Sequence, residues 1–274
     1  MKKSVIPATL LLAFTAHAQG QYATVNGLRM YYEVHGAGQP LVLLHGGGST
    51  IETSFGAVLP ELAKRHRVIA VELQAHGRTS DRNKPESFEQ DADDVAELLR
   101  QLKVQKADIV GFSNGGSTAL MIAARHPARV NKLVPIAAIY RRDGMQRGFW
   151  ASMERATFAD MPQVYKEAFL RVTPDSAKLR AMFNRDRQRM LSFQGWSDGV
   201  IRRITVPTLV IVGDHDVVRV EHALELSRLL PRGQLAVLPG AHGEYMGELM
   251  SRRPGRTPDV FIRLLEEFLS APSP

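Results

Sequence analysis

The sequence predicts an α/β domain in which a mostly parallel sheet, covered by helices on both faces, carries an inserted helical cap. Three observations lead to this prediction. Apolar runs without polar alternation are separated by helical stretches, which is typical of buried parallel strands. A serine flanked by glycines stands between one such run and a helix. Residues 140–203 contain helical pieces but no strand pattern.

The predicted elements begin with a hairpin. Asn26-Gly27 separates two strand-like runs at residues 22–25 and 28–34, and this dipeptide favours a tight hairpin turn. The apolar runs and helical patterns that follow alternate along the chain. Further strands are expected at residues 41–44, 67–72, 107–112, 132–139, 206–212 and 234–238, and helices at 51–66, 87–102, 116–126, 221–230 and 258–269.

Residues 140–203 are predicted to form the cap, and residues 19–139 and 204–274 the core. Helical pieces in the cap are interrupted at Pro162, Pro174 and Gly195. The segment holds both tryptophans and five of the ten methionines. Large apolar side chains usually pack a segment onto its neighbours, but they also suit an apolar substrate cleft. We expect the cap to select the substrate and to take no part in the chemistry.

The amino terminus is typical of an exported protein. Lys2 and Lys3 precede an apolar run at residues 5–16, and Ala16-His17-Ala18 fits a cleavage site. An N-terminal strand or an anchoring helix is the alternative, but the run is shorter than the roughly 20 residues that span a bilayer. We therefore predict a signal peptide at residues 1–18, periplasmic or secreted localisation, and no membrane anchor after cleavage.

Composition excludes several classes of function. The chain has no cysteine, which excludes disulfides and thiolate metal sites. Its net charge is +7, but no nucleic-acid-binding motif accompanies the excess, which indicates a solvated basic face. No spacing of histidines and acids fits a metal site. We expect no cofactor, no metal and no nucleic-acid partner.

The most informative motif is Gly111-Phe112-Ser113-Asn114-Gly115, between a predicted strand and a predicted helix. A serine at such a sharp turn needs small residues two positions away on either side, so that strand and helix pack closely. Its hydroxyl then projects from the sheet. Serine is a nucleophile only when an imidazole accepts its proton, and the imidazole needs a carboxylate to hold its tautomer.

Candidates for these two groups follow the last two strands. Residues 206–212 lead into Gly213-Asp214-His215-Asp216, and residues 234–238 lead into Pro239-Gly240-Ala241-His242-Gly243. Both loops leave the carboxyl ends of strands, where α/β sheets bind ligands.

With His45-Gly46-Gly47-Gly48 and the stretch from Gln74 to Ser80, these motifs resemble the α/β-hydrolase superfamily over the mature length. The resemblance implies an α/β-hydrolase fold with Ser113 as nucleophile and His242 as base. It implies Asp216 as the acid, with Asp214 and Asp143 as alternatives. The implied oxyanion donors are the backbone N–H groups of Gly47 and Asn114, with Gly48 as an alternative. His45 and His76 are expected to brace their loops.

This resemblance implies a serine esterase or lactonase that acts through an acyl-enzyme on a small-molecule ester or lactone. Related haloalkane dehalogenases and epoxide hydrolases attack with Asp, and Ser113 disfavours both. The apolar cap favours a bulky apolar acyl group, a macrolide-type lactone among the candidates. A non-hydrolytic enzyme of lyase or perhydrolase type, or a catalytically silent ligand-binding relative, is the alternative. The candidate substrate contacts are Gly48, Trp150, Met153, Trp196 and Tyr245.

Overall fold

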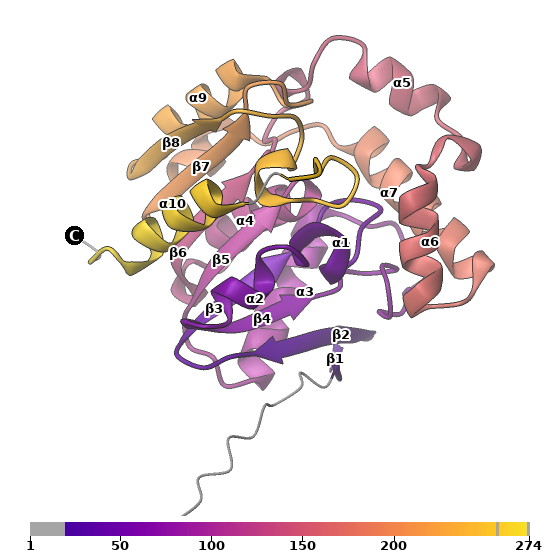
Figure 1. The fold of residues 1–274 in the computed structure, drawn as a ribbon, viewed down its shortest axis with the longest axis horizontal. Helices are drawn as coiled ribbons and strands as arrows, with labels where there is room; N and C mark the ends of the chain where they lie inside the picture. Colours follow the sequence, from indigo (N-terminus) through magenta and orange to yellow (C-terminus); the bar gives the residue numbers. More distant parts are fainter. Residues whose placement is uncertain (1–19, 256–257, 273–274) are drawn as a thin grey trace, which may run out of the picture.

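An eight-stranded sheet, parallel except at one edge, forms the centre of the molecule (Figure 1). The computed structural model describes residues 20–255 and 258–272, and the predicted signal peptide lies outside them. The strand order is β1-β2-β4-β3-β5-β6-β7-β8. Pairing is antiparallel between β1 and β2 and between β2 and β4, and parallel elsewhere. The bounds are β1 Gln21–Val25, β2 Leu28–His35, β3 Gln39–Leu44, β4 His66–Val71, β5 Ala107–Phe112, β6 Val130–Ile136, β7 Thr208–Gly213 and β8 Gly233–Leu238.

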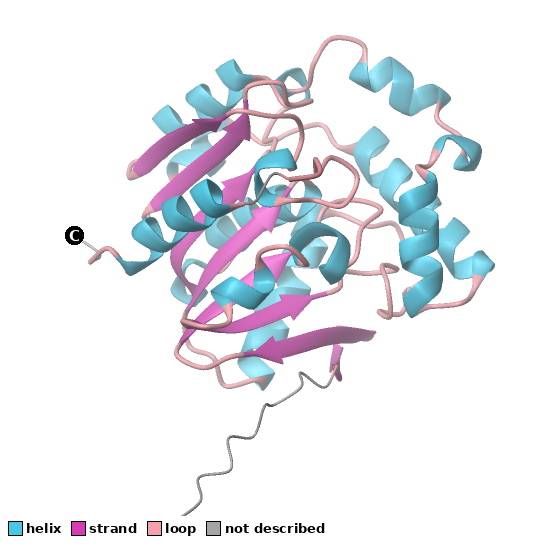
Figure 2. Ribbon diagram, viewed as in Figure 1, coloured by secondary structure: helices cyan, strands magenta, loops and turns pink. Residues whose placement is uncertain are grey.

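Helices cover both faces of this sheet because its central strands are apolar on both sides. Every residue of β5 and β7 is buried, as continuous apolar runs predict for parallel strands. In Figure 2, α2 and α10 lie in front of the sheet, and α3 and α4 lie behind it. α9 packs on β7 and β8. The bounds of these helices are α2 Leu59–Leu62, α3 Phe88–Gln101, α4 Asn114–Arg125, α9 Val220–Leu229 and α10 Asp259–Ser270.

The prediction of one long helix at residues 51–66 is wrong. The structure has two short helices there, α1 Ile51–Phe55 and α2. The carbonyl oxygen of Thr53 accepts a hydrogen bond from Leu249 N at 2.9 Å, which diverts it from a continuing helix. Pro60 has no N–H for a helical ladder and lies instead in the first turn of α2.

The strand predicted at residues 132–139 is displaced. β6 runs from Val130 to Ile136, and Ala137 adopts a φ of 49°, outside the strand region. The buried stretch that follows leads directly into the inserted segment.

Residues 140–203, all within the described part of the chain, contain helices and loops but no strand, and Met145 makes one isolated β-bridge with Val218. Residues 149–192 of this segment form the right-hand side of the molecule in Figure 1, beyond the carboxyl ends of the parallel strands. α6 starts after Pro162, and the Asp175 side chain caps α7 by accepting from Ala177 N and Lys178 N. The helices are η2 Arg142–Gly144, α5 Phe149–Arg155, η3 Phe158–Asp160, α6 Gln163–Val172, α7 Ser176–Ser192 and α8 Asp198–Arg202.

The cap has a small apolar cluster of its own, separate from the main core. Met161, Phe169, Leu179 and Met182 are buried together. α8, in contrast, contacts α4 and α9, so the chain has returned to the core before residue 203. None of the helices in the described residues is long and apolar enough to span a bilayer.

Candidate active site

Ser113 occupies the sharp turn between β5 and α4. Its backbone has φ 55° and ψ −119°, a conformation that is strained for any residue with a side chain. A Cβ at Gly111 would lie 2.1 Å from Gly115 O, and a Cβ at Gly115 would lie 2.2 Å from Leu44 O. Both positions therefore require glycine, which explains the motif around the serine.

His242 joins this serine to a buried acid. The Nε2 atom of His242 lies 3.0 Å from Ser113 Oγ, and Nδ1 lies 2.7 Å from Asp216 Oδ1. The His242 ring packs on Phe112, with centroids 4.7 Å apart. The hydroxyl of Ser251 donates to the backbone oxygen of His242 at 2.6 Å. The structure thus brings together the three residues that the resemblance implied.

The two alternative acids have other partners. Asp214 accepts a hydrogen bond from Gly240 N at 2.7 Å, and this bond lowers the pKa of its exposed carboxyl. Asp143 is exposed and pairs with Arg141 at 3.2 Å. Asp216 alone of the three contacts His242.

The loop after β3 lies beside the serine turn. A Cβ at Gly47 would lie 2.5 Å from Asn114 Nδ2, so this loop packs directly on the residue after the nucleophile. Gly47, Ser113 and Asn114 line one cavity, so the two residues expected to supply oxyanion donors lie at the same cavity as Ser113. Gly48 also lines the cavity, but its N–H donates to Asp186 Oδ2.

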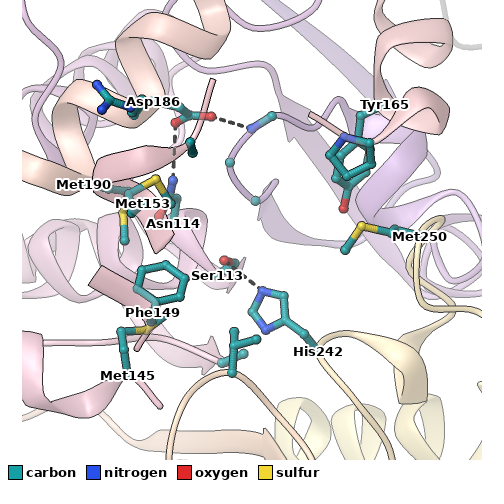
Figure 3. A pocket seen from close by; sticks show the side chains of 18 of the residues that line it. Ser113, Asn114, Met145, Phe149, Met153, Tyr165, Asp186, Met190, His242 and Met250 are labelled. Carbon is teal, nitrogen blue, oxygen red and sulfur yellow. Dashed lines mark hydrogen bonds between the residues drawn. The ribbon is translucent and has the colours of Figure 1, made fainter. Parts of the chain in front are cut away.

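That cavity has a volume of about 360 Å³ and lies between the cap and the carboxyl ends of the strands (Figure 3). Ser113 and His242 lie on its core side, and cap side chains form the opposite wall. Met250, from the loop after His242, closes one side. The apolar cap side chains in the wall include Met145, Phe149, Met153, Met161, Phe183 and Met190.

Three residues expected to contact substrate lie outside the cavity lining. Trp150 packs edge-on against Phe149 and donates to Arg142 O. Trp196 packs on Phe88 and donates to Glu89 at 2.6 Å. Tyr245 is buried against Phe261. These side chains join elements of the fold to one another, which corrects the expectation of substrate contact. Met153 and Gly48 do line the cavity.

Asp186, on α7, is a cavity residue that the sequence did not indicate. Its Oδ1 accepts from Asn114 Nδ2 at 3.3 Å, and its Oδ2 accepts from Gly48 N and from His76 Nε2, the latter at 2.9 Å. It also pairs with Arg189. No local pattern marks it, because these partners are brought together only by the fold.

The two loop histidines carry different charges. Burial lowers the pKa of His45 to about 3, so its ring is neutral. It accepts from Leu73 N at 3.0 Å and contacts Gly46 O at 2.7 Å. Burial acts in the same direction on His76, but attraction and hydrogen bonding to Asp186 outweigh it and raise the pKa to about 9. Both rings brace their loops, as expected, and His76 does so as a cation.

Comparison with known proteins identifies the family of this chain. The sequence matches the family described as alpha/beta hydrolase fold over residues 39–197. The chain belongs to that family. Both the predicted fold and the predicted superfamily are confirmed.

Relatives of this α/β hydrolase are themselves hydrolases. The chain is 32% identical to 2-hydroxymuconate semialdehyde hydrolase of Pseudomonas sp. strain CF600, over 80% of this chain and 85% of the relative. It is 28% identical to serine hydrolase BPHL of Homo sapiens, over 94% of this chain and 88% of the relative. The solved meta-cleavage product hydrolase of Pseudomonas fluorescens IP01 is 27% identical, with a TM-score of 0.72 over 91% of this chain and 97% of that one.

Proposed function

We propose that this protein is a serine hydrolase that cleaves neutral carboxylic esters or lactones through an acyl-enzyme on Ser113. The observation that carries the proposal is the hydrogen-bonded series Asp216–His242–Ser113, with its hydroxyl end at an apolar cavity. A hydroxyl, an imidazole and a buried carboxylate in this order are the components of nucleophilic acyl transfer.

The reaction follows from this arrangement. Ser113 Oγ attacks the substrate carbonyl while His242 Nε2 accepts the hydroxyl proton, and Asp216 holds the ring so that Nε2 faces the serine. The N–H groups of Gly47 and Asn114 stabilise the oxyanion. His242 then gives its proton to the leaving alkoxide, which departs from an ester but stays attached to the acyl group of a lactone. Water attacks the acyl-enzyme by the same route and releases the acid.

The size of the cavity favours a substrate whose acyl group is of intermediate size. Drug-sized ligands occupy pockets of about 300–1,000 Å³, and this cavity, at about 360 Å³, lies near the lower end. Medium-chain acyl groups and small lactone rings suit that volume better than a macrolide-type ring does. The methionine-rich wall supplies apolar contact of adaptable shape.

Charge at the cavity favours a neutral substrate. Asp186 presents a carboxylate in the wall, and attraction to His76 and Arg189 holds its pKa well below the usual range against the effect of burial. Arg189 is buried behind it and lies beside three acids, Asp186, Asp91 and Glu86. Arg187 lines the cavity but donates to Glu154 O.

Hydrolysis of a meta-cleavage product is the second candidate, favoured by the names of two relatives. A muconate semialdehyde carries a carboxylate, which the Asp186 carboxylate in the same wall would repel. Arg189 is already paired with Asp91 and Asp186, so Arg187, bonded to a backbone oxygen, is the cation in the lining that such a substrate would use. We therefore place this activity second.

Initial rates separate the two candidates. The panel contains 4-nitrophenyl esters of increasing acyl length, γ- and δ-lactones, and 2-hydroxymuconate semialdehyde. The proposal predicts the highest kcat/KM for a neutral medium-chain ester or lactone. A higher kcat/KM for the semialdehyde than for every neutral compound would overturn the proposed substrate class. Covalent labelling of Ser113 without turnover of any compound would indicate a non-hydrolytic enzyme.

A further inference from the structure

One carboxylate of the cap contacts both loops that carry the proposed oxyanion donors. Asp186 Oδ2 accepts from Gly48 N, next to the donor Gly47, and Oδ1 accepts from Asn114 Nδ2 at 3.3 Å (Figure 3). Asn114 also provides the second donor through its backbone. Gly48 and Asp186 are 138 positions apart in the sequence, so the cap must be seated on the core for this bridge to exist.

The carboxylate is itself held from behind by two cations. His76 Nε2 lies 2.9 Å from Oδ2, and Arg189 pairs with Oδ1. Arg189 is fixed in turn by Asp91 at 2.7 Å and lies 3.5 Å from Glu86. Ion pairs with buried partners have little freedom to rearrange, because an unpaired buried charge is costly. Asp186 is thus a fixed point for the two loops.

The loops have little room to move relative to this point. A Cβ at Gly47 would lie 2.5 Å from Asn114 Nδ2 and 3.1 Å from Asp186 Oδ2. The Gly47 backbone, the Asn114 side chain and the Asp186 carboxylate are therefore in mutual contact. The position of one donor relative to the other depends on all three.

We propose that Asp186 is a positioning residue for the oxyanion hole, setting the separation of the Gly47 and Asn114 N–H groups. This inference rests on the proposed function. It assigns the cap a role in transition-state stabilisation, whereas the sequence led us to expect substrate selection alone.

Asp186→Asn tests the inference because it keeps the shape and removes one acceptor. The carboxylate is surrounded by four donors, on Gly48, His76, Asn114 and Arg189, and an amide offers only one oxygen. The NH₂ group of the introduced asparagine must then face one of these donors, and because two donors repel each other, we expect a loop to be displaced. Removing an oxyanion donor outright costs about 10²–10³ in kcat. We expect the displacement to lower kcat about 10- to 100-fold with KM changed less than about 3-fold.

The affinity for a transition-state analogue distinguishes a displaced oxyanion hole from a partly unfolded protein, because only folded enzyme binds the analogue. An alkylboronic acid forms a tetrahedral adduct on a serine hydroxyl, and its Ki should rise in proportion to the loss in kcat/KM. Binding of the carboxylic acid product should stay unchanged. Asp175→Asn is the matched control, because Asp175 caps the same helix α7 by accepting from Ala177 N and Lys178 N, lies outside the cavity lining, and asparagine is an equally good cap. It should retain kcat within about 2-fold.

Asn114→Ala decides the matter if Asp186→Asn does not fold at the assay temperature, as judged by circular dichroism. It keeps the backbone donor and removes the side-chain contacts with Asp186 and Gly47. Its kcat should fall. Where Asp186→Asn does fold, the losses in kcat should not add in the double variant, since coupled residues share one effect. An Asp186→Asn or Asn114→Ala enzyme with wild-type kcat, or with a raised KM alone, would overturn the inference. A wild-type protein that neither hydrolyses esters nor binds the boronate would instead overturn the proposed function.

Discussion

Asp216 Oδ1 lies 2.7 Å from His242 Nδ1, whereas Asp214, in the same loop, bonds to Gly240 N. Asp216 is buried, and its Oδ1 also accepts from Val218 N at 3.0 Å. That second bond fixes the carboxylate for its contact with the imidazole. Asp214 is exposed and stabilises the turn that carries His242. The two acids of one short loop thus have different roles.

Asp216→Asn should lower kcat about 10⁴-fold, because an amide cannot hold the imidazole in the orientation that accepts the serine proton. Asp214→Asn, the matched control two residues away, should lower kcat less than about 10-fold, since its side-chain oxygen can still accept from Gly240 N. Steady-state kinetics on one ester measures both. The reverse order of losses would show that Asp214 is the acid.

The residues of this series were indicated by short local motifs together with the resemblance to the α/β-hydrolase superfamily. A Cβ at position 111 or 115 would lie about 2 Å from a backbone oxygen, so both positions require glycine, and this requirement is visible in five consecutive residues. Asp216 and His242 follow strands whose apolar runs are equally local. The parallel sheet then places all three at one edge.

The residues that line the cavity were harder to predict, because a sequence pattern that indicates burial does not indicate which neighbour the side chain packs against. Trp150 and Trp196 are large and apolar in part, yet they pack on neighbouring aromatic rings. Asp186 was missed for a related reason. An acid on a charged helix usually faces water, and its contacts with Gly48, His76 and Asn114 arise only from tertiary packing.

Cavity residues should control acyl size, and the tryptophans should not. Met153→Ala and Phe149→Ala remove side chains from the wall and should shift the preferred acyl chain to a longer one. The shift should be graded, because an apolar pocket discriminates by about 1–3 kcal/mol per methylene. The ratio of kcat/KM values across a series of 4-nitrophenyl esters measures it.

Trp196→Ala is the control for that series. It should leave the preferred acyl length unchanged while lowering the thermal midpoint, because it removes packing against Phe88 and Phe193. Loss of such a side chain typically costs about 3–5 kcal/mol when it is fully buried, and Trp196 is half-buried. A changed acyl preference in this variant would place Trp196 at the substrate.

Stability should fall as the pH rises from 7 to 9. Burial raises the pKa of Glu86 to about 8, and the pKa of His76 is raised to about 9. Both groups hold protons in the folded state that the unfolded chain has released, so the free energy of unfolding decreases with pH through this window. Urea unfolding at pH 7 and pH 9 should show a loss of at least about 1 kcal/mol.

Glu86→Gln should reduce that pH dependence, since glutamine mimics the protonated acid and has no proton to lose. Glu97→Gln is the control on the surface, where Glu97 pairs with Arg100, and it should leave the dependence unchanged. A free energy of unfolding that rises between pH 7 and pH 9 in the wild type would contradict the assignment of these buried protonated groups.

Covalent labelling of Ser113 tests the central claim most directly. A fluorophosphonate reacts with a serine hydroxyl that an adjacent base has activated, and intact-protein mass spectrometry counts the adducts. We expect one adduct on the wild type, located on Ser113 by peptide mapping. Ser113→Ala should show no adduct, a kcat lower by about 10⁴- to 10⁶-fold and an unchanged thermal midpoint. An unlabelled wild type, or a Ser113→Ala protein with full esterase activity, would contradict the account.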